Sequence, residues 1–284
     1  MKRVAQRWMV AQIAGLCLAA ATGASAADVQ VTDADRTFAN FTRETAIVRQ
    51  NEIRLEVNGI EKQDENNRLD LLGFPVKQLP GTAGGVKSLS GGIIDVMATY
   101  GFAKNAEVGL IIPTYVQSLT LRRGGNKLNN SDIGDVTLYG KFQRAVAEHC
   151  NVGAGMELST PNGPVDKGFG TGELGVKPFV STRYQQGRVG VGANVGMDFY
   201  THEVPSVLNY GAEVLLRINS TFAFRTEIQG RVFEQSGTRY DDLEVYPGVD
   251  VQVSDNLVIR PTGMANGTDT ALDWGIGVGV AVSF

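Results

Sequence analysis

The sequence predicts an all-β fold, a single closed antiparallel up-and-down transmembrane β-barrel of about 12 strands. Three observations support this prediction. The chain of 284 residues begins with an export signal, its strands alternate between an apolar and a polar face, and its connections alternate between short and long. At this length a β-barrel is commonly one domain, so we expect one domain after the signal.

The first 26 residues have the composition of a secretory signal peptide. Three basic residues precede an apolar run from Trp8 to Ala21, and the segment ends in Ala24-Ser25-Ala26, a small-x-small cleavage site. We therefore expect residues 1–26 to be removed and the mature chain to start at Ala27. The mature chain then carries 23 basic against 30 acidic residues, a net charge of −7, which offers no basic face to nucleic acid.

Cysteine and histidine are too scarce for a disulfide framework or a metal site. Cys17 leaves with the signal, so Cys150 has no intramolecular disulfide partner. With His149 and His202 as the only histidines, a Cys/His metal site is not expected. We expect no metal and no cofactor.

The last eleven residues show the alternation most clearly. Large apolar residues occupy every second position, and Gly, Ala or Ser stand between them. Because side chains of a strand point alternately to opposite faces, one face is wholly apolar and the other nearly bare. A chain that ends on Phe in such a strand resembles the C-terminal signal of the bacterial barrel-assembly machinery, and the residues expected to form it are Trp274, Ile276, Val278, Val280, Val282 and Phe284.

Twelve segments with this alternation are expected as strands. They lie at about 50–60, 91–102, 107–121, 133–146, 151–160, 173–185, 188–200, 208–218, 221–234, 242–253, 256–265 and 272–284. Short connections between them take turns with longer ones. Outer-membrane barrels have short periplasmic turns and longer outer loops, so both termini are expected in the periplasm.

Two segments fit the barrel pattern poorly, and each leaves two interpretations open. The leader at residues 27–49 is polar and forms either a periplasmic tail or a plug inside the lumen. Residues 61–90 either fold over or into the barrel mouth as a constriction or form a hairpin outside the lipid. The barrel itself is expected over residues 50–284.

Charged residues fall on the face opposite the apolar one, where a barrel has its lumen. The lumen-lining candidates are Arg54, Asp95, Asp135, Lys141, Glu157, Lys177, Arg183, Asp198, Glu213, Arg217, Arg225, Glu227, Arg231, Glu244, Asp250 and Arg260. They form either a ladder of salt bridges that braces a narrow lumen or the wall of a solute-selecting channel. Asp241 and Asp242 are expected in an outer loop, either solvated or bound to divalent cations.

Enzymatic interpretations fail on their motifs. Ser206 lies near His202, but no Gly-x-Ser-x-Gly elbow exists, so a membrane-surface hydrolase is the weaker hypothesis. The Gly170–Gly175 string matches a dinucleotide fingerprint but enters a strand rather than a helix. We do not expect an enzyme.

Several Gly-rich strings across nearly the whole mature chain resemble the outer-membrane family labelled meta-pathway phenol-degradation proteins. The strings are Val31-Thr32-Asp33, Ile53 to Val57, Tyr100-Gly101-Phe102, Glu107 to Leu110, Pro113, Ile133 to Lys141, Leu158 to Gly163 and Gly170-Thr171-Gly172. The chain departs from the family where Ala34-Asp35-Arg36 replaces an Arg-Pro pair. The resemblance implies a barrel and, through the family label, passage of aromatic or other hydrophobic compounds.

The sequence thus favours a porin-like channel or transporter for passive passage of small molecules in the outer membrane of a Gram-negative bacterium. Its expected partners are outer-membrane lipid and lipopolysaccharide, the barrel-assembly machinery and a small-molecule solute. The alternative is a plugged structural barrel that contacts other surfaces through its outer loops.

Overall fold

We describe the fold from a computed structural model of the chain, over residues 48–64, 86–121, 127–201, 204–235, 237–268 and 274–284. The expected signal peptide and nearly all of the leader lie outside these residues, as do 65–85 of the expected mouth segment and His202. The strands in this part of the chain are β1 (Ile53–Asp64), β2 (Val86–Ala103), β3 (Ala106–Leu121), β4 (Lys127–Ile133), β5 (Thr137–Ala147), β6 (Cys150–Ser159), β7 (Gly175–Gln186), β8 (Val189–Tyr200), β9 (Val207–Arg217), β10 (Phe222–Gln235), β11 (Thr238–Ser254), β12 (Leu257–Asn266) and β13 (Trp274–Ser283).

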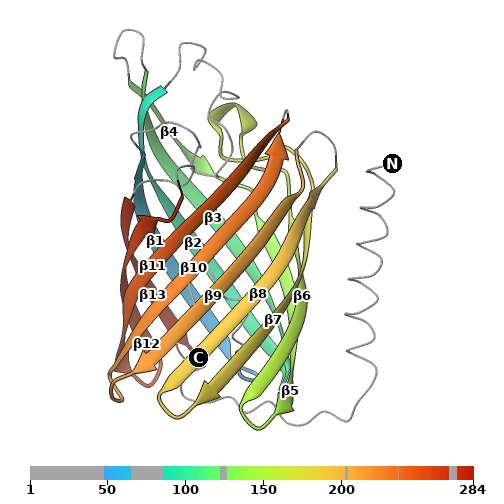
Figure 1. The fold of residues 1–284 in the computed structure, drawn as a ribbon, viewed down its shortest axis with the longest axis vertical. Helices are drawn as coiled ribbons and strands as arrows, with labels where there is room; N and C mark the ends of the chain where they lie inside the picture. Colours follow the sequence, from blue (N-terminus) through green and yellow to red (C-terminus); the bar gives the residue numbers. More distant parts are fainter. Residues whose placement is uncertain (1–47, 65–85, 122–126, 202–203, 236, 269–273) are drawn as a thin grey trace.

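Twelve of these strands close into a single antiparallel barrel (Figure 1), which confirms the predicted fold class. Each strand pairs with its neighbours in the chain, except that β3 pairs with β5 around the circle. β1 closes the barrel by pairing with β13 over ten residue pairs, from Arg54 opposite Ser283 to Gln63 opposite Trp274. Closure leaves no sheet edge inside the lipid, the condition that a membrane imposes on strands.

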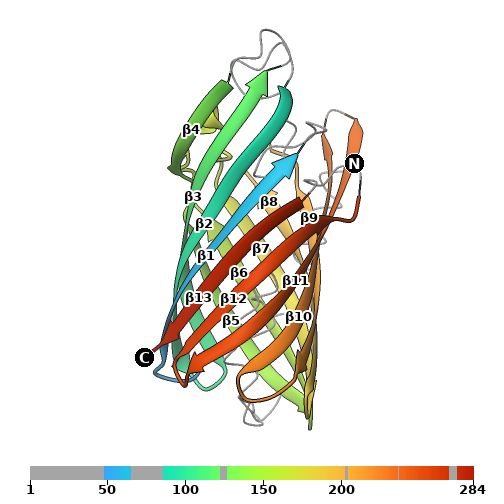
Figure 2. The same cartoon turned by 90° about the vertical axis from the view of Figure 1, so that its left-hand side faces the viewer.

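β4 is an additional strand outside the twelve-strand circle. It pairs with Thr114 to Thr120 of β3, while β5 pairs with the other half of the same strand, from Ala106 to Ile111. Residues 134–136 separate β4 from β5, so the single strand expected at 133–146 is interrupted near its start. Figure 2 shows β2, β3 and β4 rising beyond the other strands at one end of the barrel.

The two ends of the barrel differ in their connections. Short turns such as those after Ala103 and Ala147 lie at one end, which we call the turn end, together with the C-terminus. The long connections, including residues 160–174 between β6 and β7, lie at the other end, which we call the loop end. The alternation read from the sequence is therefore present in the structure.

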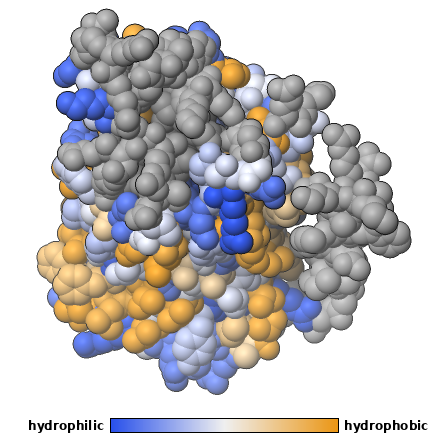
Figure 3. Space-filling model, turned by 45° about the horizontal axis from the view of Figure 1, so that its top comes forward, coloured by the Kyte–Doolittle hydropathy of each residue, from blue (hydrophilic) through white to orange (hydrophobic). Residues whose placement is uncertain are grey.

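Apolar side chains face outward all round the wall. The alternation places Leu138, Val214 and Phe224 on the outer surface, each about half exposed, and the outward residues of β13 follow the same pattern. Figure 3 shows hydrophobic residues over much of the lower wall, with hydrophilic residues along its lower rim and nearer the mouth. Within the described residues, no helix has the length and apolar character needed to cross a bilayer.

Candidate functional site in the barrel lumen

The inner face of the barrel gathers charged side chains into two groups at different depths. The two-residue period of a strand places them there, because the charged residues of β1 and of β6 to β12 face inward while their chain neighbours face outward. We call the set nearer the turns the inner group: Arg54, Glu56, Arg183, Glu213, Arg225, Glu227, Asp250 and Arg260. The set nearer the loops is the outer group: Lys62, Glu157, Lys177, Asp198, Arg231, Asp242 and Glu244.

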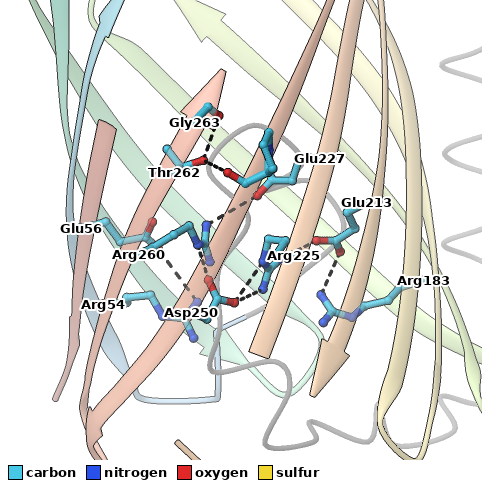
Figure 4. A network of polar contacts seen from close by, with 11 residues as sticks. Arg54, Glu56, Arg183, Glu213, Arg225, Glu227, Asp250, Arg260, Thr262 and Gly263 are labelled. Carbon is cyan, nitrogen blue, oxygen red and sulfur yellow. Dashed lines mark hydrogen bonds and ion pairs between the residues drawn. The ribbon is translucent and has the colours of Figure 1, made fainter. Parts of the chain in front are cut away.

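The inner group is joined by ion pairs that run from strand to strand (Figure 4). Arg225 donates from Nε and Nη2 to Asp250 Oδ2, at 3.1 and 2.9 Å, and from Nη1 to Glu213. Arg260 bonds the other oxygen of Asp250 and lies 3.6 Å from Glu227. At the β7 end of this chain of contacts, Arg183 approaches Glu213 at 3.4 Å.

The inner group is almost completely buried. The side chains of Arg225, Asp250 and Arg260 are each 1% exposed, and that of Glu213 is 2% exposed. Four guanidinium groups face four carboxylates, so the group is neutral overall. Removing charges from water is costly unless each is paired, and here both carboxylate oxygens of Asp250 are used. At this depth the side chains form a buried, ion-paired network along the inner wall, which we call the brace.

The outer group is also ion-paired, but its Lys177, Glu157 and Arg231 side chains are more exposed. Lys62 Nζ bonds both Glu244 oxygens at 3.0 and 2.9 Å, and also the Tyr246 hydroxyl at 2.9 Å. Lys177 lies 3.0 Å from Glu157, with side chains 13% and 10% exposed, and the Arg231 side chain is 24% exposed beside Asp242. Greater exposure means that these charges remain nearer to water than those of the inner group.

An apolar cluster lies beside the outer group at the loop end. It joins inward side chains of β1, β2, β3, β11 and β12 to one residue of the β6–β7 connection, and its members are Ile60, Leu89, Tyr115, Leu119, Phe169, Tyr246 and Met264. Phe169 is fully buried and stacks on Tyr115, with ring centroids 5.4 Å apart and an interplanar angle of 7°. We call residues 160–174 the mouth loop, because they carry Phe169 into the opening.

Two contacts hold the tip of the mouth loop to β3 and β4. The side-chain amide of Gln117 on β3 donates to the Lys167 carbonyl at 2.7 Å, and Lys167 Nζ bonds Asp132 Oδ2 at 2.7 Å. The hydrogen bond from Lys167 holds the pKa of Asp132 below its usual value of 3.8, and the same bond raises the pKa of Lys167 above 10.5. Both groups are therefore charged at neutral pH.

The chain that leads into β1 enters the turn end from inside the wall. Val48 is 3% exposed, and its N–H donates to Glu107, which is also paired with Lys141 at 3.0 Å. Gly101 on β2 faces this segment so closely that a Cβ there would lie 2.0 Å from the Arg49 carbonyl oxygen. Val48 is thus packed in the barrel near its turn end.

The sequence candidates occupy three kinds of position. Most lie in the two groups, Lys141 pairs with Glu107, and Asp95 is half-buried on the Met97 side of β2. Arg217 ends β9 at the turn end, with its backbone N–H bonded to Arg188. Asp135 lies in the interruption between β4 and β5 and bonds the mouth loop.

Some charged lumen residues were absent from the sequence candidates, in part because strand ends were misplaced. β1 extends to Asp64, beyond the predicted end at 60, and so brings Lys62 into the lumen. β11 starts at Thr238, so Asp242 is 2% exposed and paired with Arg231, and the expectation that it lies in an outer loop was wrong. Glu107 lies at the beginning of β3, where too few alternating residues precede it to indicate which face its side chain is on.

Catalytic groups are not assembled around the one histidine that is described. His149 lies in a turn, 3.9 Å from Glu148 and edge-on to the Tyr184 ring. Over the described ranges, no group of three or more His, Cys, Asp or Glu side chains is arranged to hold a metal ion.

Comparisons with known proteins give a fold and no family. No protein-family model matches the chain, and no curated protein matches it. Among solved structures, the COG4313 outer membrane channel from Pseudomonas putida F1 matches with a TM-score of 0.65 at 12% identity, over 87% of this chain and all of that one. The NanC porin matches with a TM-score of 0.52 at 13% identity, over 80% of this chain and 98% of that one. The β domain of the Bordetella autotransporter BrkA matches with a TM-score of 0.51 at 13% identity, over 83% of this chain and all of that one. This chain therefore has the fold of outer-membrane β-barrels, channels among them.

Proposed function

We propose that this protein is a channel in the outer membrane of a Gram-negative bacterium, through which small molecules pass passively. One observation carries the proposal: a closed barrel with an apolar outer surface and charged side chains on its inner face. A soluble barrel would bury the apolar face and expose the charged one, so this distribution suits lipid outside and a polar lumen. The signal peptide expected at residues 1–26 supports export to that membrane, where lipid, lipopolysaccharide and the barrel-assembly machinery would be its partners.

We infer that the solute is a small molecule with both an apolar and a charged part. At the loop end the buried apolar cluster lies beside charges of the outer group, so aromatic, aliphatic and ionic side chains meet there. The resemblance to the phenol-degradation family points the same way, toward aromatic or hydrophobic compounds. Aromatic acids are therefore the solutes to compare first with sugars and amino acids in a liposome-swelling survey. We assign no catalytic role to any residue.

Ion selectivity tests whether the charged lumen is the passage. The Arg231 side chain is part-exposed on the inner face, so the variant Arg231→Glu should shift the reversal potential in planar bilayers toward cation selectivity. Arg239→Glu is the matched control, because Arg239 is 72% exposed near the loop-end tip of β11. If the reversal potential is the same in wild type and Arg231→Glu, the proposal that ions pass through this lumen is rejected.

A plugged structural barrel is the second candidate, and the inner group favours it. Its ion pairs are buried near the turn end, and Val48 packs inside the same end. A barrel closed by these contacts would brace the envelope or present its loops to other surfaces. Bilayer recordings separate the candidates, because a permanently closed barrel gives no conductance steps.

A further inference from the structure

The mouth loop is anchored by a carboxylate in the barrel wall. Asp135 stands in the gap between β4 and β5, and its two oxygens accept different parts of the loop. Oδ1 accepts the Gly163 N–H at 2.8 Å, while Oδ2 accepts the Thr171 N–H at 2.7 Å and the Thr171 hydroxyl at 2.9 Å. One side chain therefore bonds both the start and the end of the loop through three hydrogen bonds.

Adjacent contacts extend the attachment along the wall. The Thr160 N–H and hydroxyl both donate to the Val136 carbonyl, at 2.9 and 2.8 Å, so the loop leaves β6 already bonded beside Asp135. The Gly134 N–H donates to the Pro113 carbonyl at 2.8 Å, which fixes the gap itself against β3. The anchor is therefore held from the wall side and from the loop side.

Glycine is required where the loop and the wall meet. A Cβ on Gly134 would lie 2.3 Å from the Tyr115 ring and 2.8 Å from the Phe169 carbonyl oxygen. A Cβ on Gly163 would lie 2.4 Å from the same Phe169 oxygen, and one on Gly170 would lie 2.3 Å from the Gly163 oxygen. The string Ile133 to Lys141 thus lies on one side of a close contact, and the strings Leu158 to Gly163 and Gly170-Thr171-Gly172 lie on the other.

Across this contact the loop delivers Phe169 to the opening. Phe169 lies two residues before Thr171, and its ring stacks on inward-facing Tyr115 at the loop end of β3. The Asp135 bonds on both sides of it, to Gly163 and Thr171, fix the stretch of chain that carries the ring. Without them, the loop would be held inside the opening mainly by the contacts of Gln117, Asp132 and Phe169 itself.

We infer that Asp135 is a positioning residue for solute selection: it holds the mouth loop across the loop end of the lumen, and the fixed loop sets the largest solute that enters. This inference rests on the proposed channel function. Asp135 does not touch the solute, since its oxygens are occupied by the loop. Its effect on passage comes from where it places Phe169.

The test compares Asp135→Ala with wild type in two measurements. Hydrogen–deuterium exchange of the 160–174 peptide reports the loop directly, and liposome swelling with sugars of increasing size reports the limit for entry. We expect faster exchange at Gly163 and Thr171 in Asp135→Ala, and entry of larger sugars than in wild type. The control Asp166→Ala removes an exposed carboxylate from the same loop and should behave as wild type in both measurements.

A second variant covers the case in which Asp135→Ala fails to fold, as judged by heat-modifiable migration. Phe169→Ala keeps the Asp135 bonds and removes the stacked ring, so it should raise the size limit without equal loss of exchange protection at Gly163. Faster exchange with an unchanged size limit in Asp135→Ala would overturn the inference, as would unchanged exchange. If wild type and both variants pass no solute at all, the proposed channel function fails together with the inference. Failure of the inference alone differs from this result, because wild type then still passes small sugars.

Discussion

The ion pairs of the inner group depend on single residues that serve more than one partner. Asp250 accepts from Arg225 on β10 and from Arg260 on β12, and so joins three neighbouring strands. Because all three side chains are 1% exposed, neither arginine has water in place of the carboxylate. Loss of Asp250 should therefore destabilise the brace more than loss of either ion pair alone.

Replacing this carboxylate should destabilise the barrel strongly. Asp250→Ala leaves two buried guanidinium groups short of a partner, and breaking a buried pair by removing one member costs about 3 to 5 kcal/mol. The measurement is the urea midpoint for loss of the folded, heat-modifiable form in detergent. Glu148→Ala serves as the control, because its side chain is 86% exposed in a turn. Equal midpoints for the two variants would mean that the inner group contributes no stability.

Among the strands, β13 shows how one element satisfies two environments. Its large apolar residues point to the lipid, and glycines such as Gly275 and Gly277 face inward. A Cβ on Gly277 would lie 2.5 Å from the Gly59 carbonyl oxygen and 3.1 Å from Ile60, so the bare face lets β1 approach closely. The alternation in this strand thus gives a lipid face and also the tight seam that closes the barrel.

A charge on the lipid face of β13 should lower the stability of the barrel by an amount that depends on its depth in the membrane. Val278 is 50% exposed near the middle of the strand, so Val278→Arg should destabilise the barrel by about 2 to 4 kcal/mol. Val282 lies near the turn end, where the same change should cost only about 0 to 1 kcal/mol. Urea titrations of folding into lipid vesicles measure both. An identical cost at the two positions would contradict a membrane around this strand.

The exterior of the whole molecule is apolar, and its exposure to water is unfavourable in free energy. Exposed Ile, Leu, Val and aromatic side chains occur on strands all round the circle, from Ile53 on β1 to Trp274 on β13. Soluble monomers rarely carry a contiguous apolar surface of this extent. The barrel as a unit, rather than any one residue, therefore requires a lipid or detergent environment.

Purification of the mature chain provides the corresponding test. We expect the exported protein to begin at Ala27, to fractionate with outer membranes, and to need detergent to remain monodisperse. Amino-terminal sequencing and fractionation of the expressing cells measure the first two, and light scattering measures the third. A monodisperse preparation in plain buffer, or recovery with periplasmic contents, would exclude the membrane barrel.

Local periodicity was sufficient to predict the fold. The alternation along β8, β10 and β13 needs only the side chains of one strand, because a period of two residues is a property of the extended backbone. The lengths of the connections then gave the up-and-down order. Strand ends were less certain: Lys62 lies beyond the expected end of its strand, and Asp242, at the expected start of its strand, was assigned to an outer loop.

The tertiary structure decided which charges meet and what fills the opening. Lys62 and Glu244 are 182 positions apart, and they touch because closure brings β1 within reach of β11. Asp135 and Thr171 meet only because the mouth loop folds back on the wall. A sequence shows which way a side chain points, since that is set by its own strand. Its partner is set by the register and curvature of strands distant in the chain, and these exist only once the barrel has closed.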